Sequence, residues 1–106
     1  MRIKILGKYW NLKFVNFLGN NREDGEILGK CEHPESVERT IYVKRGQKPK
    51  EEFDSILHEC NHALNWHASE EFVYQASNDL TDILWKLGYR RLKGKELKEF
   101  DDKNNR

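Results

Sequence analysis

The sequence lacks the features that mark membrane and secreted proteins. Charged residues make up 35% of its 106 residues. No segment approaches the roughly 20 consecutive apolar residues that a membrane-spanning helix needs. The first eight residues contain charges and no uninterrupted apolar run, so they do not resemble a secretory signal. Asn-x-Ser/Thr glycosylation sites are also missing. We therefore exclude a membrane protein and a secreted miniprotein, and expect a cytoplasmic protein.

The sequence also has few cysteines and almost no net charge. Cys31 and Cys60 are the two cysteines, and neither belongs to a Cys-x-x-Cys pair. This excludes a disulfide scaffold and a cysteine-rich structural zinc site. The 19 basic residues are balanced by 18 acidic ones, whereas nucleic-acid-binding proteins usually have a basic excess. The composition therefore argues against a nucleic-acid partner, and only the basic run at residues 90–95 would favour such a regulator.

The first half of the chain is rich in β-branched and aromatic residues, which favour strands. The expected strands are residues 2–6, 10–17, 26–30 and 39–44. Turn-forming residues separate them, so we expect a small antiparallel sheet of three to four strands. With helices after the strands, the predicted fold class is α+β. Residues 1–92 are expected to form one domain. Residues 93–106 have few apolar anchors and are expected to form a flexible tail.

The second half shows two helical patterns. Pro49 fits the first position of a helix, and Glu51 and Glu52 suit its positive end. A second helix is expected after Ser69, which is a good N-cap, and Gly88 is expected to end it. Apolar residues recur at helical spacing in both, so each helix is expected to bury one stripe. The stripes are Phe53, Ile56, Leu57, Cys60 and Leu64, and then Val73, Ala76, Leu80, Ile83, Leu84 and Leu87.

The segment with the clearest chemistry is His58-Glu59-Cys60-Asn61-His62, an H-E-x-x-H motif. Residues four apart lie one helical turn apart on the same face, so both imidazoles can reach one metal ion. Glu59 projects from a neighbouring angle, where it can take a proton from a metal-activated water and pass it to a leaving amine. The two histidines fall opposite the apolar stripe, with Glu59 at its flank. The motif therefore predicts a metal site facing a cleft.

Zinc hydrolases commonly use three protein ligands, so a third ligand must come from elsewhere. The candidates are His67, Glu70 and Glu71. His67 lies five positions after His62, one short of the longer H-E-x-x-H-x-x-G-x-x-H arrangement, and the glycine of that motif is missing. Glu70 lies at the edge of the second stripe, and Glu71 is rotated about 100° further toward solvent. Helical phase therefore favours Glu70, although either glutamate could instead stabilise the N-terminus of the helix.

These motifs resemble those of small zincin-like metallopeptidases, the minimal gluzincins of phages, mobile elements and bacteria. The resemblance covers residues 25–88 and is strongest at residues 56–64 and 69–73. It implies a small sheet, an H-E-x-x-H helix and a following helix that supplies the third ligand from a Glu-x-x-(Ala or Val) pattern. Here that pattern begins at Glu70, which the resemblance therefore favours as the third ligand.

Two further expectations concern the surroundings of the site. Tyr74 stands where gluzincins often have an acidic or amide residue. Support for a liganding histidine is therefore expected from elsewhere, for example from a backbone carbonyl or a side chain of the second helix. The candidate side chains are Asn78, Asp79 and Asp82. The strand at residues 39–44 could form a sheet edge along which an extended peptide pairs.

The sequence predicts a zinc-dependent metallopeptidase that acts on a protein or peptide substrate. His58, His62 and Glu70 are the expected zinc ligands, and Glu59 is the expected general base and acid. The competing interpretation is a zinc-binding interaction or regulatory module that retains the motif without turnover. The substrate, the cleavage site and the oligomeric state are left open.

Overall fold

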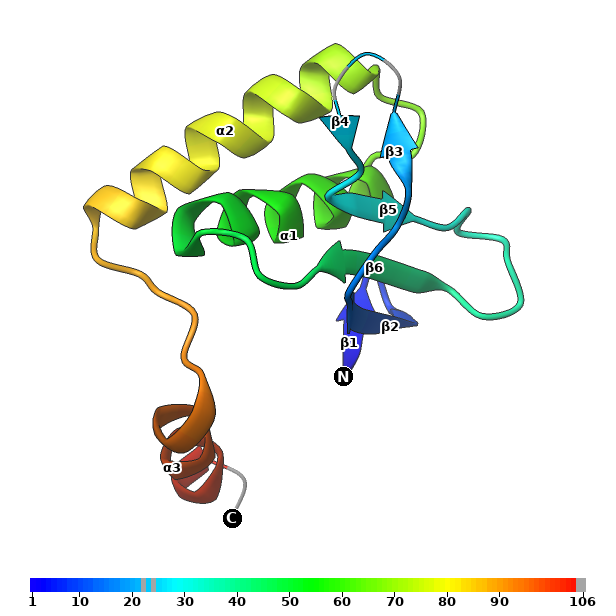
Figure 1. Cartoon of the computed structure of the whole chain (residues 1–106). Helices are drawn as coiled ribbons and strands as arrows, with labels where there is room; N and C mark the ends of the chain where they lie inside the picture. Colours follow the sequence, from blue (N-terminus) through cyan, green and yellow to red (C-terminus); the bar gives the residue numbers. More distant parts are fainter. Residues whose placement is uncertain (22, 24, 105–106) are drawn as a thin grey trace.

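The computed structural model describes residues 1–21, 23 and 25–104. This part of the chain forms a four-stranded sheet, a two-stranded ribbon and three helices (Figure 1). The strands are β1 (Arg2–Ile5), β2 (Lys8–Val15), β3 (Asn20–Asn21), β4 (Gly25–Glu26), β5 (Gly29–Cys31) and β6 (Thr40–Lys44). The helices are α1 (Pro49–Leu64), α2 (Glu70–Lys86) and α3 (Gly94–Asn104). The α+β class, with strands before helices, is confirmed.

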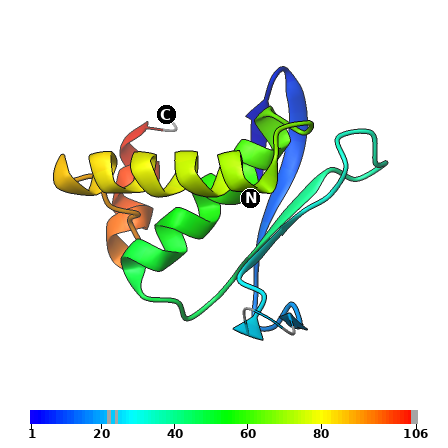
Figure 2. The same cartoon turned by 90° about the horizontal axis from the view of Figure 1, so that it is seen from above.

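Helix α1 lies between the sheet and α2. It packs on β5 and β6 and reaches β1, whereas α2 contacts α1 alone among the described elements (Figures 1 and 2). The main core forms where α1 meets the sheet, and its buried members are apolar. They are Ile5, Trp10, Leu12, Ile41, Val43 and Ala63. Because α1 is covered on two sides, side chains from the sheet and from α2 can both meet it.

The sheet is mixed, with strand order β1-β2-β6-β5. Strands β1 and β2 pair antiparallel, as do β5 and β6, but β2 and β6 run parallel with Leu12 opposite Ile41. The expected antiparallel sheet is therefore wrong at this central pair. The chain leaves β2, forms the β3–β4 ribbon and β5, and returns through β6 into the gap between β2 and β5. Alternation within a strand determines which side chains face inward but not which strand becomes its neighbour.

The position of β6 overturns a second expectation. Because β6 lies between β2 and β5, residues 39–44 do not form a sheet edge. The edge strands of this sheet are β1 and β5. The predicted strand at residues 26–30 is also divided, since β4 ends at Glu26 and β5 begins at Gly29.

The buried face of α1 is more polar than the apolar stripe predicted. Its buried residues are Glu52, Ser55, Glu59 and Ala63. Leu64 of the predicted stripe is 47% exposed. Ile56 and Cys60 pack against the core, while Phe53 contacts Trp85 of α2 with ring centroids 6.4 Å apart. The apolar stripe therefore divides its contacts between the sheet and α2, and a polar row faces the sheet.

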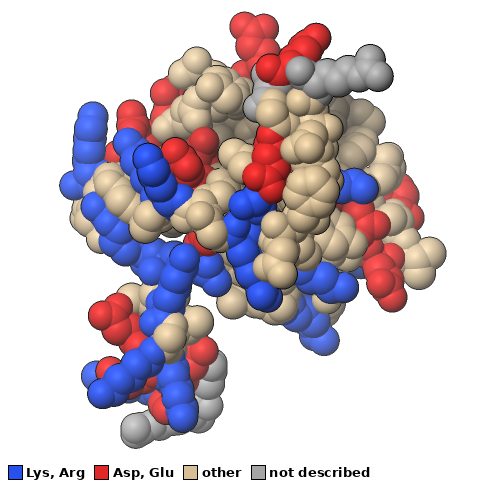
Figure 3. Space-filling view, viewed as in Figure 1, with Lys and Arg blue, Asp and Glu red and all other residues tan. Residues whose placement is uncertain are grey.

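Residues 87–93, which we call the strap, lead from α2 back across the start of α1. Arg91 Nη1 lies 2.7 Å and Lys93 Nζ 3.1 Å from Glu52 Oε1. Arg90 stacks on Trp85, with its guanidinium 3.3 Å from the ring centroid. Several members of the basic run are thus used within the fold. Figure 3 shows Lys and Arg gathered where α2 ends, α1 begins and the strap passes.

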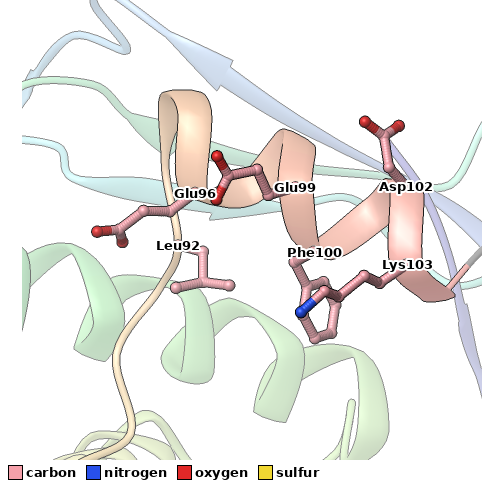
Figure 4. A pocket seen from close by; sticks show the side chains of 6 residues that line it. All are labelled: Leu92, Glu96, Glu99, Phe100, Asp102 and Lys103. Carbon is pink, nitrogen blue, oxygen red and sulfur yellow. The ribbon is translucent and has the colours of Figure 1, made fainter.

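Helix α3 occupies most of the segment expected to be a flexible tail, and residues 105–106 lie outside the described part. The helix buries none of its residues and contacts no other described element. A hollow on its surface is formed by the strap and α3 themselves (Figure 4). Its lining residues are Leu92, Glu96, Glu99, Phe100, Asp102 and Lys103. The flexibility of this segment stays a prediction. Across the described residues, no helix is both long and apolar enough to cross a membrane.

Candidate metal centre

His58, His62 and Glu70 converge at the contact between α1 and α2. Glu70 Oε1 lies 2.8 Å from His58 Nε2, and Glu70 Oε2 lies 2.9 Å from His62 Nε2. The two histidine Nε2 atoms are 3.1 Å apart. Within the part of the chain that the structure describes, this is the one group of three His, Cys, Asp or Glu residues placed to share a metal ion. The structure thus brings together the three predicted ligands.

Local structure explains this convergence. The histidines are four residues apart on α1, so their rings lie on one face with centroids 4.8 Å apart. A short turn follows α1, and the Ser69 hydroxyl accepts a hydrogen bond from the Phe72 backbone N–H at 3.1 Å. This N-cap fixes the start of α2. Glu70 is the first residue of α2 and reaches back to the histidines.

The donor set fits a zinc ion. Zinc binds imidazole nitrogen and carboxylate oxygen at about 2.0–2.2 Å, so tetrahedral ligand atoms lie about 3.3 Å apart. The three distances of 2.8, 2.9 and 3.1 Å are slightly shorter than this spacing. Small side-chain rotations would therefore admit an ion. Two imidazoles and a carboxylate would leave one position for water or substrate, as in catalytic zinc sites.

The electrostatics of the site favour a neutral imidazole at His62. Burial lowers the pKa of His62; the Glu70 carboxylate raises it, and the charge of His58 lowers it again. A neutral imidazole keeps a free lone pair for a metal. Both histidine side chains are 18% exposed, whereas the Glu70 side chain is 71% exposed. The histidines are thus half-buried on α1, and the carboxylate closes the cluster from the solvent side.

Glu59 faces the sheet and is buried, whereas the sequence placed it at the flank of the helix. It is 7% exposed. Burial, followed by the negative charge of Glu70, raises the pKa of Glu59 to about 7. The side chain packs against the backbone of Gly29 on β5: a methyl group there would lie 2.7 Å from Glu59 Oε2 and 2.8 Å from its Cγ. The Glu59 side chain therefore occupies the space that a side chain at position 29 would need, and glycine leaves that space free.

A cleft of about 430 Å³ opens beside these residues. The β3–β4 ribbon and the segment leading into β5 form one wall, α1 forms the other, and Tyr74 of α2 contributes to the rim. His58 and Glu59 both line it. Tyr74 is 60% exposed. The cleft gives an external molecule a route to the histidine and to the buried carboxylate.

The other candidate ligands lie outside the cluster. Glu71 is exposed and is not a member of the three-residue group. His67 lines a separate hollow together with Trp66 and His33. The ring centroids of Trp66 and His33 are 4.8 Å apart. The structure therefore distinguishes Glu70 from both alternatives by position.

The side chains expected to support a histidine were Asn78, Asp79 and Asp82, and none of them does so in a described contact. The Asn78 amide, turned to face Asp54, donates a hydrogen bond to it at 2.9 Å, and Thr81 donates another to Asp54 at 3.1 Å. Asp79 accepts a hydrogen bond from Gln75 at 3.1 Å, and Asp82 pairs with Lys50. Asp54, which the sequence reasoning missed, instead joins α1 to α2 one turn before His58.

Gly29 is the other residue that sequence reasoning missed in this role. A glycine within a strand often marks a close approach of another group to the backbone. That signal was present in the sequence, but it does not reveal which group approaches. Neither cysteine belongs to the cluster of His58, His62 and Glu70. Burial, with the Glu59 charge next, raises the pKa of Cys31 to about 12 and also raises that of Cys60.

The chain was compared with protein-family models, curated proteins and solved structures. No protein-family model, curated protein or solved structure matches the chain.

Proposed function

We propose that this protein is a zinc-dependent metallopeptidase. His58, His62 and Glu70 would hold the ion, and Glu59 would act as general base and then general acid. The observation that carries the proposal is the convergence of two imidazoles and a carboxylate within 4.8 Å, next to a cleft lined by Glu59. Two histidines and a carboxylate with an open position suit zinc and also Fe(II). The glutamate that follows the first histidine in the H-E-x-x-H motif favours zinc-dependent hydrolysis.

The chemistry divides between the ion and the chain. Bound zinc would act as a Lewis acid that polarises a peptide carbonyl and makes water more acidic. Glu59 would receive a proton from the attacking water and deliver it to the leaving amine as the C–N bond breaks. Gly29 would keep the Glu59 carboxylate in place by leaving room for it. The cleft volume lies at the lower end for ligand sites, so substrate recognition would depend on few contacts.

The test is zinc content in protein purified without a metal-binding tag. Wild type is expected to hold about one zinc per chain. Glu70→Ala should lose most of it, because the ion would keep two of its three protein ligands. Glu71→Ala is the matched control: it removes the neighbouring glutamate of the same helical turn, and its zinc content should equal that of wild type. Elemental analysis of dialysed samples provides the measurement.

Each result has a definite meaning. Zinc retained by Glu70→Ala and lost by Glu71→Ala would identify Glu71 as the third ligand. A wild-type protein that stays zinc-free after reconstitution with the metal would overturn the proposal. Circular dichroism of each variant shows whether a loss of zinc merely reports a loss of fold.

Gly29→Ala is expected to lower peptide cleavage about 10- to 100-fold, the range for residues that orient a functional group. The added methyl would force the Glu59 carboxylate out of its place, because contacts of 2.7–3.0 Å are too short. Zinc content should stay unchanged, since none of the three proposed ligands is involved. Lys30→Ala, an exposed neighbour on β5, is the control. Equal cleavage by Gly29→Ala and wild type would show that the position of Glu59 is not critical.

A further inference from the structure

The outer flank of α2 carries an apolar row that the fold does not bury. We call this row the α2 stripe; it consists of Phe72, Ala76, Leu80, Ile83 and Leu87. Its four large members are 55%, 48%, 54% and 68% exposed, in chain order. Most of these residues were expected in the core. Four large apolar side chains at about half exposure leave a patch on the order of 400 Å², which is often functional on a monomer.

The contact of α2 with α1 buries few apolar side chains by comparison. The buried residues of this 17-residue helix are Val73, Ser77 and Thr81, of which one is apolar. Among the described residues, Ser77 Oγ is the buried side-chain atom without a hydrogen-bond partner. Helices in proteins owe most of their stability to burial of an apolar face. The more apolar side of α2 is therefore the side that α1 leaves open.

The spacing of the stripe indicates what kind of surface covers it. Ala76, Leu80, Ile83 and Leu87 follow one another at intervals of four, three and four residues. This alternation is the a/d repeat by which one helix packs along another. The geometry thus favours a second helix lying lengthwise against α2.

Charges beside the stripe indicate which helix this is. Asp79 and Lys86 are exposed and lie seven residues apart, so both flank the stripe on the same side. Reversing the direction of a second α2 would place its Lys86 beside Asp79 of the first, and the symmetry would repeat the pair. The two ends of the helix also carry opposite charges: Glu70 and Glu71 lie at its start, and Lys86 lies in its last turn. An antiparallel copy is complementary to this distribution, and a parallel one is not.

We propose that the α2 stripe binds a second copy of this chain, with the two α2 helices antiparallel. Leu80 of each copy would pack near Ile83 of the other, and Ala76 near Leu87. The dimer would also hold α2 more firmly, although the proposal does not depend on metal binding or turnover. Pairing two such patches buries on the order of 1,000 Å², at the low end for specific interfaces. The association should therefore be reversible, with a dissociation constant in the micromolar range or weaker.

The first test is molar mass against concentration. The wild-type chain, which has a monomer mass of 12.7 kDa, should approach twice that mass in sedimentation equilibrium between about 5 and about 500 µM. Ile83→Glu should remain monomeric throughout, because it places a charge in the paired stripe. Val37→Glu is the matched control, since Val37 is fully exposed on a loop far from α2 in the sequence; it should dimerise like wild type.

Charge reversal tests the antiparallel arrangement directly. Asp79→Lys should weaken dimerisation about tenfold, because two like-charged pairs replace two opposite ones. Lys86→Asp should do the same, and the double variant Asp79→Lys/Lys86→Asp should restore wild-type association. These surface changes leave the buried residues of α2 intact, which circular dichroism can check. A wild-type mass of one chain at about 500 µM overturns the proposal, as does a double variant as weak as the single ones.

Discussion

Replacing Glu59 with Gln is expected to lower peptide cleavage by about 10²- to 10⁴-fold, the usual contribution of a general acid–base group. Zinc content should remain at the wild-type level, because Glu59 is not one of the three clustered donors. Gln has almost the same size as Glu and fits against Gly29, but its amide cannot take a proton from water. The measurement is cleavage of a peptide library by zinc-loaded protein, with products identified by mass spectrometry.

The matched control is Glu51→Gln, the same change at an exposed position on the first turn of α1. It should cleave the library like wild type. Cleavage by Glu59→Gln at the wild-type rate would assign the activity to another group or to a contaminating protease. Zinc-loaded wild type that cleaves no peptide would favour the alternative function, a zinc-binding module without turnover. Zinc content thus tests whether the site binds the metal, and cleavage tests separately whether the site is catalytic.

The convergence of His58, His62 and Glu70 could be predicted because its determinants are local. Histidines four residues apart meet on any helix, and Pro49 and Ser69 occupy the expected positions at the starts of α1 and α2. Glu70 follows the cap directly, so its position depends on a short turn. Its proximity to both histidines needed just one tertiary contact, that of α1 with α2.

The environment of Glu59 could not be predicted in the same way. Helical phase placed the side chain at a flank, whereas the structure buries it because β5 crosses that side of α1. Its neighbour Gly29 lies 30 residues earlier in the sequence. A close approach between a strand and a helix depends on the order of strands in the sheet. That order contains the parallel β2–β6 pair, which no local pattern specifies.

The α2 stripe shows a related limit. Periodicity identifies an apolar face, but it does not state whether the same chain or another one covers that face. Leu80, Ile83 and Leu87 have the spacing of core residues and are about half exposed or more. Val73, Ser77 and Thr81 occupy the contact with α1 instead. Small side chains permit that contact, and the larger ones remain on the outer flank.

The second large effect concerns the buried carboxylate of Glu52. This residue is 3% exposed, and Arg91 and Lys93 of the strap are its ion-pair partners. The Arg91 guanidinium also lies 3.9 Å from the ring centroid of Phe14. One side chain therefore connects the strap, α1 and β2. Burial alone would raise the pKa of Glu52, but the hydrogen bonds and charges of Arg91 and Lys93 lower it.

Arg91→Ala is expected to reduce the free energy of unfolding at pH 7 by about 3 kcal/mol, because it leaves a buried charge with one partner instead of two. The cation–π contact with Phe14 is lost as well. Urea denaturation gives the value. Arg90→Ala is the control: Arg90 stacks on Trp85 but does not contact a buried carboxylate. Its cost should stay near 1 kcal/mol, and an equal cost for both variants would contradict the role of Glu52.

Acid should diminish the difference between wild type and Arg91→Ala. The folded-state pKa of Glu52 is depressed below its ordinary value of 4.5. Its contribution is therefore complete above that value and is lost as the pH falls through the folded-state pKa. Other carboxylates titrate in both proteins and cancel in the comparison. What remains at low pH is the packing of Arg91 on Phe14. A difference that stays constant from pH 7 to about pH 3 would show that Arg91 stabilises the strap by packing alone.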